Sequence, residues 1–122
     1  MPLAYVLDEH LRGPLWRAVQ RHNALGTEPL DALRVGDPSD LPLGTGDAEL
    51  LLWAEKANRL LISFDEKSLA GHLASHLAAG NHCPGIFIPR RQGNIPTLLA
   101  FLVEAAYRSR PGEWQDRIEY IP

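Results

Sequence analysis

Three stretches of the chain are apolar at nearly every position. They cover residues 3–8, 59–64 and 85–89. Such runs are typical of strands in a parallel sheet, because helices bury both faces of that kind of sheet. We expect residues 29–35 to form a further short strand, and the weak alternation over residues 114–121 indicates a last one.

Between the strands, apolar residues recur with the spacing of an α-helix. This spacing covers residues 14–24, 46–57, 66–79 and 96–109. Strands that alternate with helices of this length form βαβ units. The pattern therefore predicts one α/β domain over residues 1–122, with a mainly parallel, doubly wound sheet of four or five strands flanked by helices. The runs at 3–8 and 59–64 are expected to be its central strands.

The composition is that of a globular protein, and the net charge limits which functions are expected. Of the 122 residues, 45% are hydrophobic and 22% are charged, and the formal net charge is −3. A protein that binds nucleic acid mainly by coating its phosphates is usually basic, so the charge argues against an avid, non-specific binder. It is compatible with a nuclease whose acids gather at one metal, because a bound metal reverses the local charge.

The sequence carries no sign of export or of membrane insertion. Cys83 is the single cysteine, so no internal disulfide forms and no oxidising compartment is required. The first residues lack the basic region of a signal peptide, and no apolar run approaches the roughly 20 residues that span a bilayer. We therefore expect a cytoplasmic protein without a membrane partner.

Three aspartates fall where parallel α/β sheets bind their ligands. Asp8 closes the first predicted strand, Asp65 closes the strand at 59–64, and Asp47 begins the helix before that strand. Ligands of open parallel sheets bind outside the carboxyl ends of the strands. Carboxylates that converge there repel one another unless a cation lies between them, and Mg²⁺ or Mn²⁺ prefers such oxygen ligands. The pattern predicts a divalent-metal site at which a metal-bound water attacks a phosphodiester.

Acidic neighbours of these aspartates are candidates for a fourth carboxylate. Glu9 follows Asp8 and Glu66 follows Asp65. Glu49 is less favoured, because two residues along a helix turn its side chain about 200° away from that of Asp47.

Each aspartate also has a purely structural explanation. Asp8 and Asp65 precede predicted helices, where Asp caps backbone N–H groups, and Asp47 in a first helical turn gains from the helix dipole. The arrangement of all three at one predicted edge favours the metal site.

Arg90 and Arg91 follow the predicted strand at 85–89, at the same edge of the sheet. Their guanidinium groups are candidates to hold RNA phosphates, with a solvated loop as the simpler interpretation.

The same residues lie in motifs that resemble the short PIN-like domain family. The motifs are, in order, Val6-Leu7-Asp8-Glu9-His10-Leu11, Gly46-Asp47-Ala48-Glu49-Leu50-Leu51 and Leu61-Ile62-Ser63-Phe64-Asp65-Glu66-Lys67. The run Gly85-Ile86-Phe87-Ile88 and the predicted helix at 96–109 resemble the family's fourth strand and last helix. The resemblance covers nearly the whole chain.

This resemblance implies a PIN-like fold and a ribonuclease that depends on Mg²⁺ or Mn²⁺. By position, Asp8, Asp47 and Asp65 would be the catalytic, metal-binding carboxylates, with Glu9 and Ser63 as auxiliary residues. It also implies RNA as the substrate and, in many relatives, a toxin role beside a small antitoxin. We expect an antitoxin or a homodimer as the partner.

Two other functions remain open from the sequence. A signalling receiver domain is also a small doubly wound domain, with an acidic pair after its first strand and a phosphorylated Asp after its third. Asp8, Glu9 and Asp65 match that outline, but a receiver also needs a Lys after its last strand, and no Lys follows Lys67. The other alternative is a PIN-like binding module that has lost catalysis.

Overall fold

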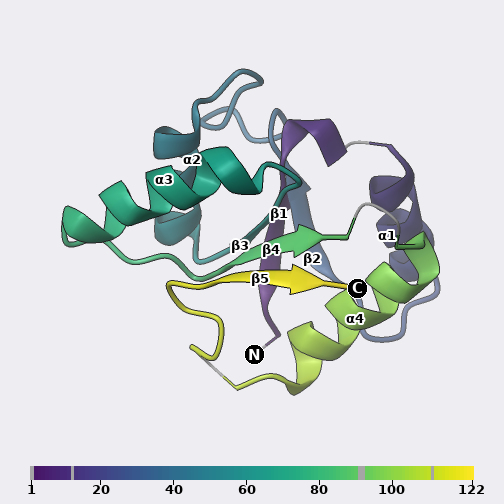
Figure 1. Cartoon of the computed structure of the whole chain (residues 1–122). Helices are drawn as coiled ribbons and strands as arrows, with labels where there is room; N and C mark the ends of the chain where they lie inside the picture. Colours follow the sequence, from purple (N-terminus) through teal and green to yellow (C-terminus); the bar gives the residue numbers. More distant parts are fainter. Residues whose placement is uncertain (1, 12, 91–92, 111) are drawn as a thin grey trace.

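The structure is a computed structural model that describes residues 2–11, 13–90, 93–110 and 112–122. Strands and helices alternate along the chain (Figure 1). The elements are β1 (Ala4–Leu7), the 3₁₀ turn η1 (Glu9–Leu11), α1 (Pro14–Ala24), β2 (Asp31–Arg34), α2 (Asp47–Ala57), β3 (Leu60–Ile62), α3 (Glu66–Ala78), β4 (Ile86–Pro89), α4 (Ile95–Arg108) and β5 (Ile118–Ile121). The predicted α/β alternation is confirmed, and the sheet has the larger of the two expected strand numbers.

All five strands are parallel, in the order β2-β1-β3-β4-β5. The two strands predicted to be central are β1 and β3, and both lie inside the sheet. From β1 the chain moves outward to β2 and then returns to β3 on the other side of β1, so the direction of winding changes between β1 and β3. In doubly wound sheets, such a topological switch point opens a crevice at the carboxyl ends of the two strands.

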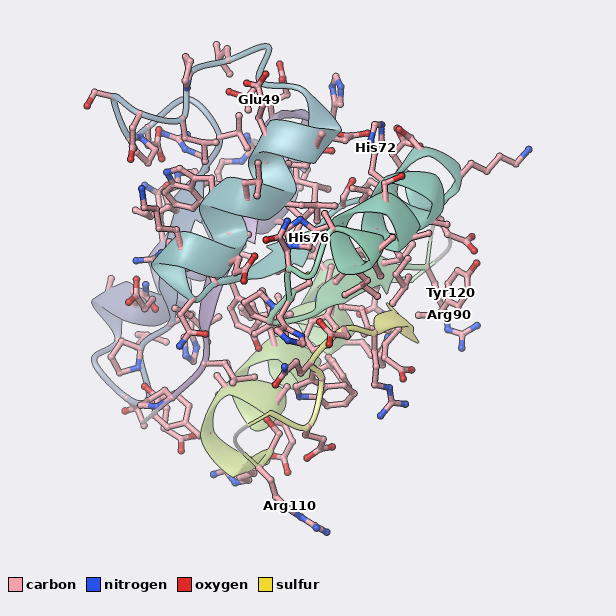
Figure 2. All side chains as sticks on the ribbon, turned by 90° about the vertical axis from the view of Figure 1, so that its left-hand side faces the viewer. Glu49, His72, His76, Arg90, Arg110 and Tyr120 are labelled. Carbon is pink, nitrogen blue, oxygen red and sulfur yellow. The ribbon has the colours of Figure 1, made fainter. Side chains whose placement is uncertain are left out.

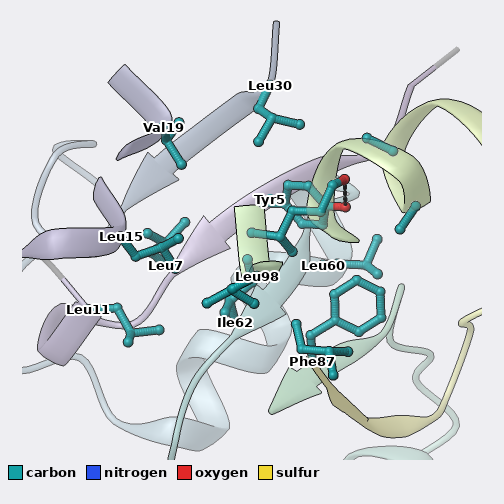
Figure 3. Close-up of a cluster of buried hydrophobic side chains, with 14 residues drawn as sticks. Tyr5, Leu7, Leu11, Leu15, Val19, Leu30, Leu60, Ile62, Phe87 and Leu98 are labelled. Atoms are coloured by element: carbon teal, nitrogen blue, oxygen red, sulfur yellow. Dashed lines mark hydrogen bonds between the residues drawn. The ribbon is translucent and has the colours of Figure 1, made fainter. Parts of the chain in front are cut away.

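Helices cover both faces of the sheet, each over its own hydrophobic cluster. α1 and α4 pack on one face and α2 and α3 on the other (Figure 1). Tyr5 and Phe87 are fully buried under α1 and α4, and the Tyr5 hydroxyl donates a hydrogen bond of 2.7 Å to the carbonyl of Leu102 (Figure 3). Val6 and Leu61 lie in the cluster under α2 and α3. This burial on both faces explains why β1 and β3 are apolar at successive positions.

Trp53 is partly buried and packs against the cluster under α2 and α3. The neighbouring Leu52 is the more exposed of the two, with half of its surface accessible.

Within the described part of the chain, no helix combines the length and the hydropathy needed to cross a membrane.

Candidate functional site

The predicted site residues gather at the carboxyl edge of the sheet, beside the switch point between β1 and β3. Asp8 directly follows β1, and Ser63 and Asp65 follow β3. The parallel pairing continues past the ends of both strands, because the Asp8 N–H donates to the Ile62 carbonyl at 3.0 Å. The sheet therefore fixes Asp8 beside Ser63, as two neighbouring positions on adjacent strands.

Ser63 joins the first and third predicted carboxylates. Its side chain is buried, with 1% of its surface exposed, and its Oγ donates a hydrogen bond of 2.8 Å to Oδ2 of Asp8. The same Oγ accepts the backbone N–H of Asp65 at 3.1 Å. A hydroxyl that donates to one group and accepts from another is fixed in direction, so Ser63 sets the orientation of the Asp8 carboxylate.

Ser68 joins Asp65 to Asp47. Asp65 is the N-cap of α3, and its Oδ1 accepts the backbone N–H of Ser68 at 3.2 Å. The Ser68 hydroxyl donates a hydrogen bond to Oδ2 of Asp47, the first residue of α2. The capping role that the sequence offered for Asp65 is thus confirmed, and it forms part of a continuous chain from Asp8 through Ser63, Asp65 and Ser68 to Asp47.

The three carboxylates share one edge, but they do not meet directly. Among the described residues, no group of three or more Asp, Glu, His or Cys side chains is arranged closely enough to hold a metal ion. Two serine hydroxyls stand in the hydrogen-bond chain between the acids. Neighbouring carboxylates repel one another, and the donors to them, the hydroxyls to Asp8 and Asp47 and the Ser68 N–H to Asp65, lower the energy of the arrangement.

Two helices begin at this site. α2 starts at Asp47 and α3 starts at Glu66, immediately after its cap Asp65. The N-terminus of a helix carries a partial positive charge and unpaired N–H groups, which stabilise nearby carboxylates and attract phosphate. The edge therefore combines acidic side chains with two backbone dipoles suited to anions.

The two glutamates beside the aspartates have separate contacts. Oε1 of Glu9 accepts the backbone N–H of Gly44 at 3.0 Å, which ties the loop before α2 to the end of β1. Glu66 accepts a hydrogen bond from the hydroxyl of Tyr120, and this bond raises the pKa of Tyr120 above its usual value. Glu49 is exposed, two residues after Asp47 on α2. Glu9 thus holds a neighbouring segment to the site.

Arg90 lies at the same edge, directly after β4. Its side chain is exposed, and its backbone N–H donates to the carbonyl of Ile121 at 3.1 Å, so the pairing between β4 and β5 extends to it. Arg91, the other predicted phosphate contact, lies outside the described residues.

Two further residues belong to this edge and were not assigned to the site from the sequence. Ser68 is not found from the sequence, because its contact with Asp47 depends on how α2 and α3 pack. Tyr120 belongs to β5, and 53% of its surface is exposed. In the sequence it is one aromatic residue within the predicted strand at 114–121, and no signal there distinguishes it from a packing residue.

Comparison of the chain with protein-family profiles, with curated proteins and with solved structures found no match.

Proposed function

We propose that this protein is a divalent-metal-dependent ribonuclease, with Asp8, Asp47 and Asp65 as its metal-binding carboxylates. The observation that carries the proposal is the hydrogen-bond chain through Ser63 and Ser68, which brings all three aspartates to the carboxyl edge of the sheet beside its switch point. A structural cap explains Asp65 alone. It does not explain why Asp8 and Asp47, from two other elements, end at the same edge.

The donor atoms at this edge suit Mg²⁺ or Mn²⁺. They are carboxylate and hydroxyl oxygens, which hard cations prefer. Mg²⁺ in proteins is commonly held by one or two carboxylates together with waters and substrate phosphates, so three carboxylates spaced by hydroxyls are compatible with it. When bound, the ion would activate a water and neutralise charge on the phosphate.

The chain's own residues then have distinct tasks. Ser63 keeps the Asp8 carboxylate in one orientation, and Glu9 holds the loop that leads to Asp47. The N-termini of α2 and α3 offer partial positive charge to the phosphodiester. Arg90 lies exposed at the end of the next strand, where it would contact a neighbouring phosphate.

A toxin role, with an antitoxin or a second copy of the chain as partner, belongs to the same proposal. Its support is the resemblance of the sequence motifs to PIN-like toxins. Leu25, Leu43 and Leu52, each at least half exposed, offer apolar surface for such a contact.

The proposal is tested by adding Mg²⁺ or Mn²⁺ to the protein and an end-labelled RNA of mixed sequence, with EDTA and the same-sequence DNA as controls. We expect cleavage only with metal, and products without a 2′,3′-cyclic phosphate, because water rather than the 2′-hydroxyl attacks. Metal should also stabilise the fold, by about 2.7 kcal/mol at 100 times its dissociation constant. Cleavage that persists in EDTA with cyclic products would reveal a contaminant. Metal and RNA binding without cleavage would contradict the ribonuclease and support a binding module.

One observation favours a second candidate function, the receiver-like domain phosphorylated on Asp65. The strand order β2-β1-β3-β4-β5 is the one that flavodoxin-like proteins and receiver domains share, and Asp65 lies at the end of the third strand. Incubation with acetyl phosphate and Mg²⁺, followed by mass spectrometry, separates the two. A phosphoryl group that Asp65→Asn abolishes would support the receiver, and an unmodified protein would leave the ribonuclease in place.

We expect Ser63→Ala to weaken both stability and cleavage. The substitution removes the donor to Asp8 and the acceptor of the Asp65 N–H, at a cost of about 1–2 kcal/mol in unfolding free energy. Loss of a residue that orients a metal ligand typically lowers metal affinity or activity about 10- to 100-fold. Ser75→Ala, on the exposed surface of α3, is the matched control. If both variants cut RNA equally well at a temperature where both are folded, Ser63 does not position Asp8.

A further inference from the structure

The last row of side chains on one face of the sheet runs from the acidic site to Tyr120. In the parallel register Leu7 pairs with Ile62, Ile62 with Phe87, and Ile88 with Tyr120. One residue further along the strands, Asp8 is level with Ser63. Ser63 is in turn level with Ile88, because the Ser63 N–H donates a hydrogen bond to the Phe87 carbonyl. Partners in a parallel register share a face. Tyr120 therefore lies in the row of Asp8 and Ser63, two strands beyond Ser63, or about 10 Å away.

Tyr120 is an exposed aromatic residue beside α3. The residue has 53% of its surface accessible, on the face of the sheet that α2 and α3 cover. Its charged neighbour is Glu66, in the first turn of α3 and one residue after Asp65. The exposed ring is available for stacking.

Arg90 directly follows β4, the strand between β3 and β5. It is two residues after Ile88, so it lies on the same face as Ile88 and Tyr120. Figure 2 shows Arg90 and Tyr120 together on one side of the molecule, with Arg110 at a different end. Along the edge, Asp65 after β3, Arg90 after β4 and Tyr120 on β5 follow one another.

We infer that Tyr120 is a substrate-positioning residue, which stacks on an unpaired base of RNA whose neighbouring phosphate Arg90 holds. The inference rests on the proposed ribonuclease function and deepens it, since it requires an unpaired nucleotide next to the cleavage site. Along the edge of the sheet, the acids would hold a metal-bound phosphate, the cation a second phosphate and the aromatic ring a base. Tyrosine rings stack on bases with little sequence preference, and arginine contacts phosphate.

The test compares two fluorescent probes in a binding assay. One is a 12-nucleotide oligouridylate, and the other is the matching abasic ribose-phosphate oligomer, which has the same phosphates and no bases. Fluorescence anisotropy is measured with Ca²⁺ in place of Mg²⁺. Ca²⁺ also binds oxygen ligands, but in a looser geometry. We expect Tyr120→Leu to weaken binding of the oligouridylate about 5- to 100-fold and to leave binding of the abasic probe unchanged. Tyr120→Phe, which keeps the ring, should restore most of the lost affinity.

Substitutions of arginine provide the matched control. Arg90→Ala should weaken binding of both probes alike and lower the salt dependence of binding, by about 0.7 in log–log slope for one phosphate contact on a single strand. Arg110→Ala, an exposed arginine beyond the far end of α4, should change neither. The inference is overturned if Tyr120→Leu weakens both probes equally, if it weakens neither, or if the wild-type protein binds neither probe. This test measures binding and not cleavage. Its result can therefore contradict the role of Tyr120 separately from the proposed ribonuclease activity.

Discussion

Asp8→Asn should lower metal-dependent RNA cleavage by at least about 100-fold, more than the loss of a residue that merely orients a ligand. The substitution removes the negative charge that would face the metal. It keeps an oxygen that accepts the hydrogen bond from Ser63. The unfolding free energy without metal should therefore stay the same or rise slightly, because one of the repelling charges at the edge is gone. The stabilisation by Mg²⁺ should fall together with the activity.

Two comparisons make this prediction specific to the site. Asp40→Asn removes an equal charge from the exposed loop before α2 and should leave cleavage at the wild-type rate. Asp65→Asn should also abolish cleavage, although it preserves a cap on α3, since Asn caps a helix nearly as well as Asp. If Asp8→Asn and Asp65→Asn both cut RNA at the wild-type rate, the acids are structural and the ribonuclease proposal is wrong.

The fold could be predicted from the sequence because its strongest signals come from burial. β1 and β3 lie under helices on both faces, and this produces the continuous apolar runs that mark them as interior strands. The last strand was harder to place. Weak alternation extended over residues 114–121, whereas β5 covers only Ile118–Ile121. A turn anchored by Asp116 occupies the rest, since the Asp116 carboxylate accepts the Cys83 N–H at 2.7 Å. A side-chain contact across 33 residues leaves no local trace in the sequence.

The place of the acidic residues could also be predicted, but not how they are connected. A strand that ends in Asp puts that carboxylate at the carboxyl edge whatever the details of packing, so Asp8 and Asp65 were found from position alone. The part of Ser68 depends on the packing of α2 against α3, which no periodicity in the sequence determines. Tyr120 became visible only through the register, which places it level with Ile88.

Gly85→Ala should cause the largest loss of stability, about 3–5 kcal/mol in unfolding free energy. Gly85 is buried just before β4 and has a φ of +144°, a conformation that is almost confined to glycine. A Cβ atom there would lie 2.8 Å from the carbonyl oxygen of Trp114 and 2.9 Å from its Cβ. The Trp114 ring packs edge-on against Phe87, with the ring centroids 5.1 Å apart, so neither side yields without disturbing the core.

The measurement is a thermal or urea denaturation curve, and Gly71→Ala is the matched control. Gly71 lies on the exposed side of α3, where a Cβ meets nothing within 4 Å, so alanine there should stabilise the fold by up to about 1 kcal/mol. Gly85 lies at the amino end of β4, away from the acids at the carboxyl edge. The folded fraction of Gly85→Ala should therefore cut RNA at the wild-type rate at low temperature. A variant as stable as the wild type would show that the segment around Trp114 moves freely, and that its contact with β4 does not fix the end of the sheet.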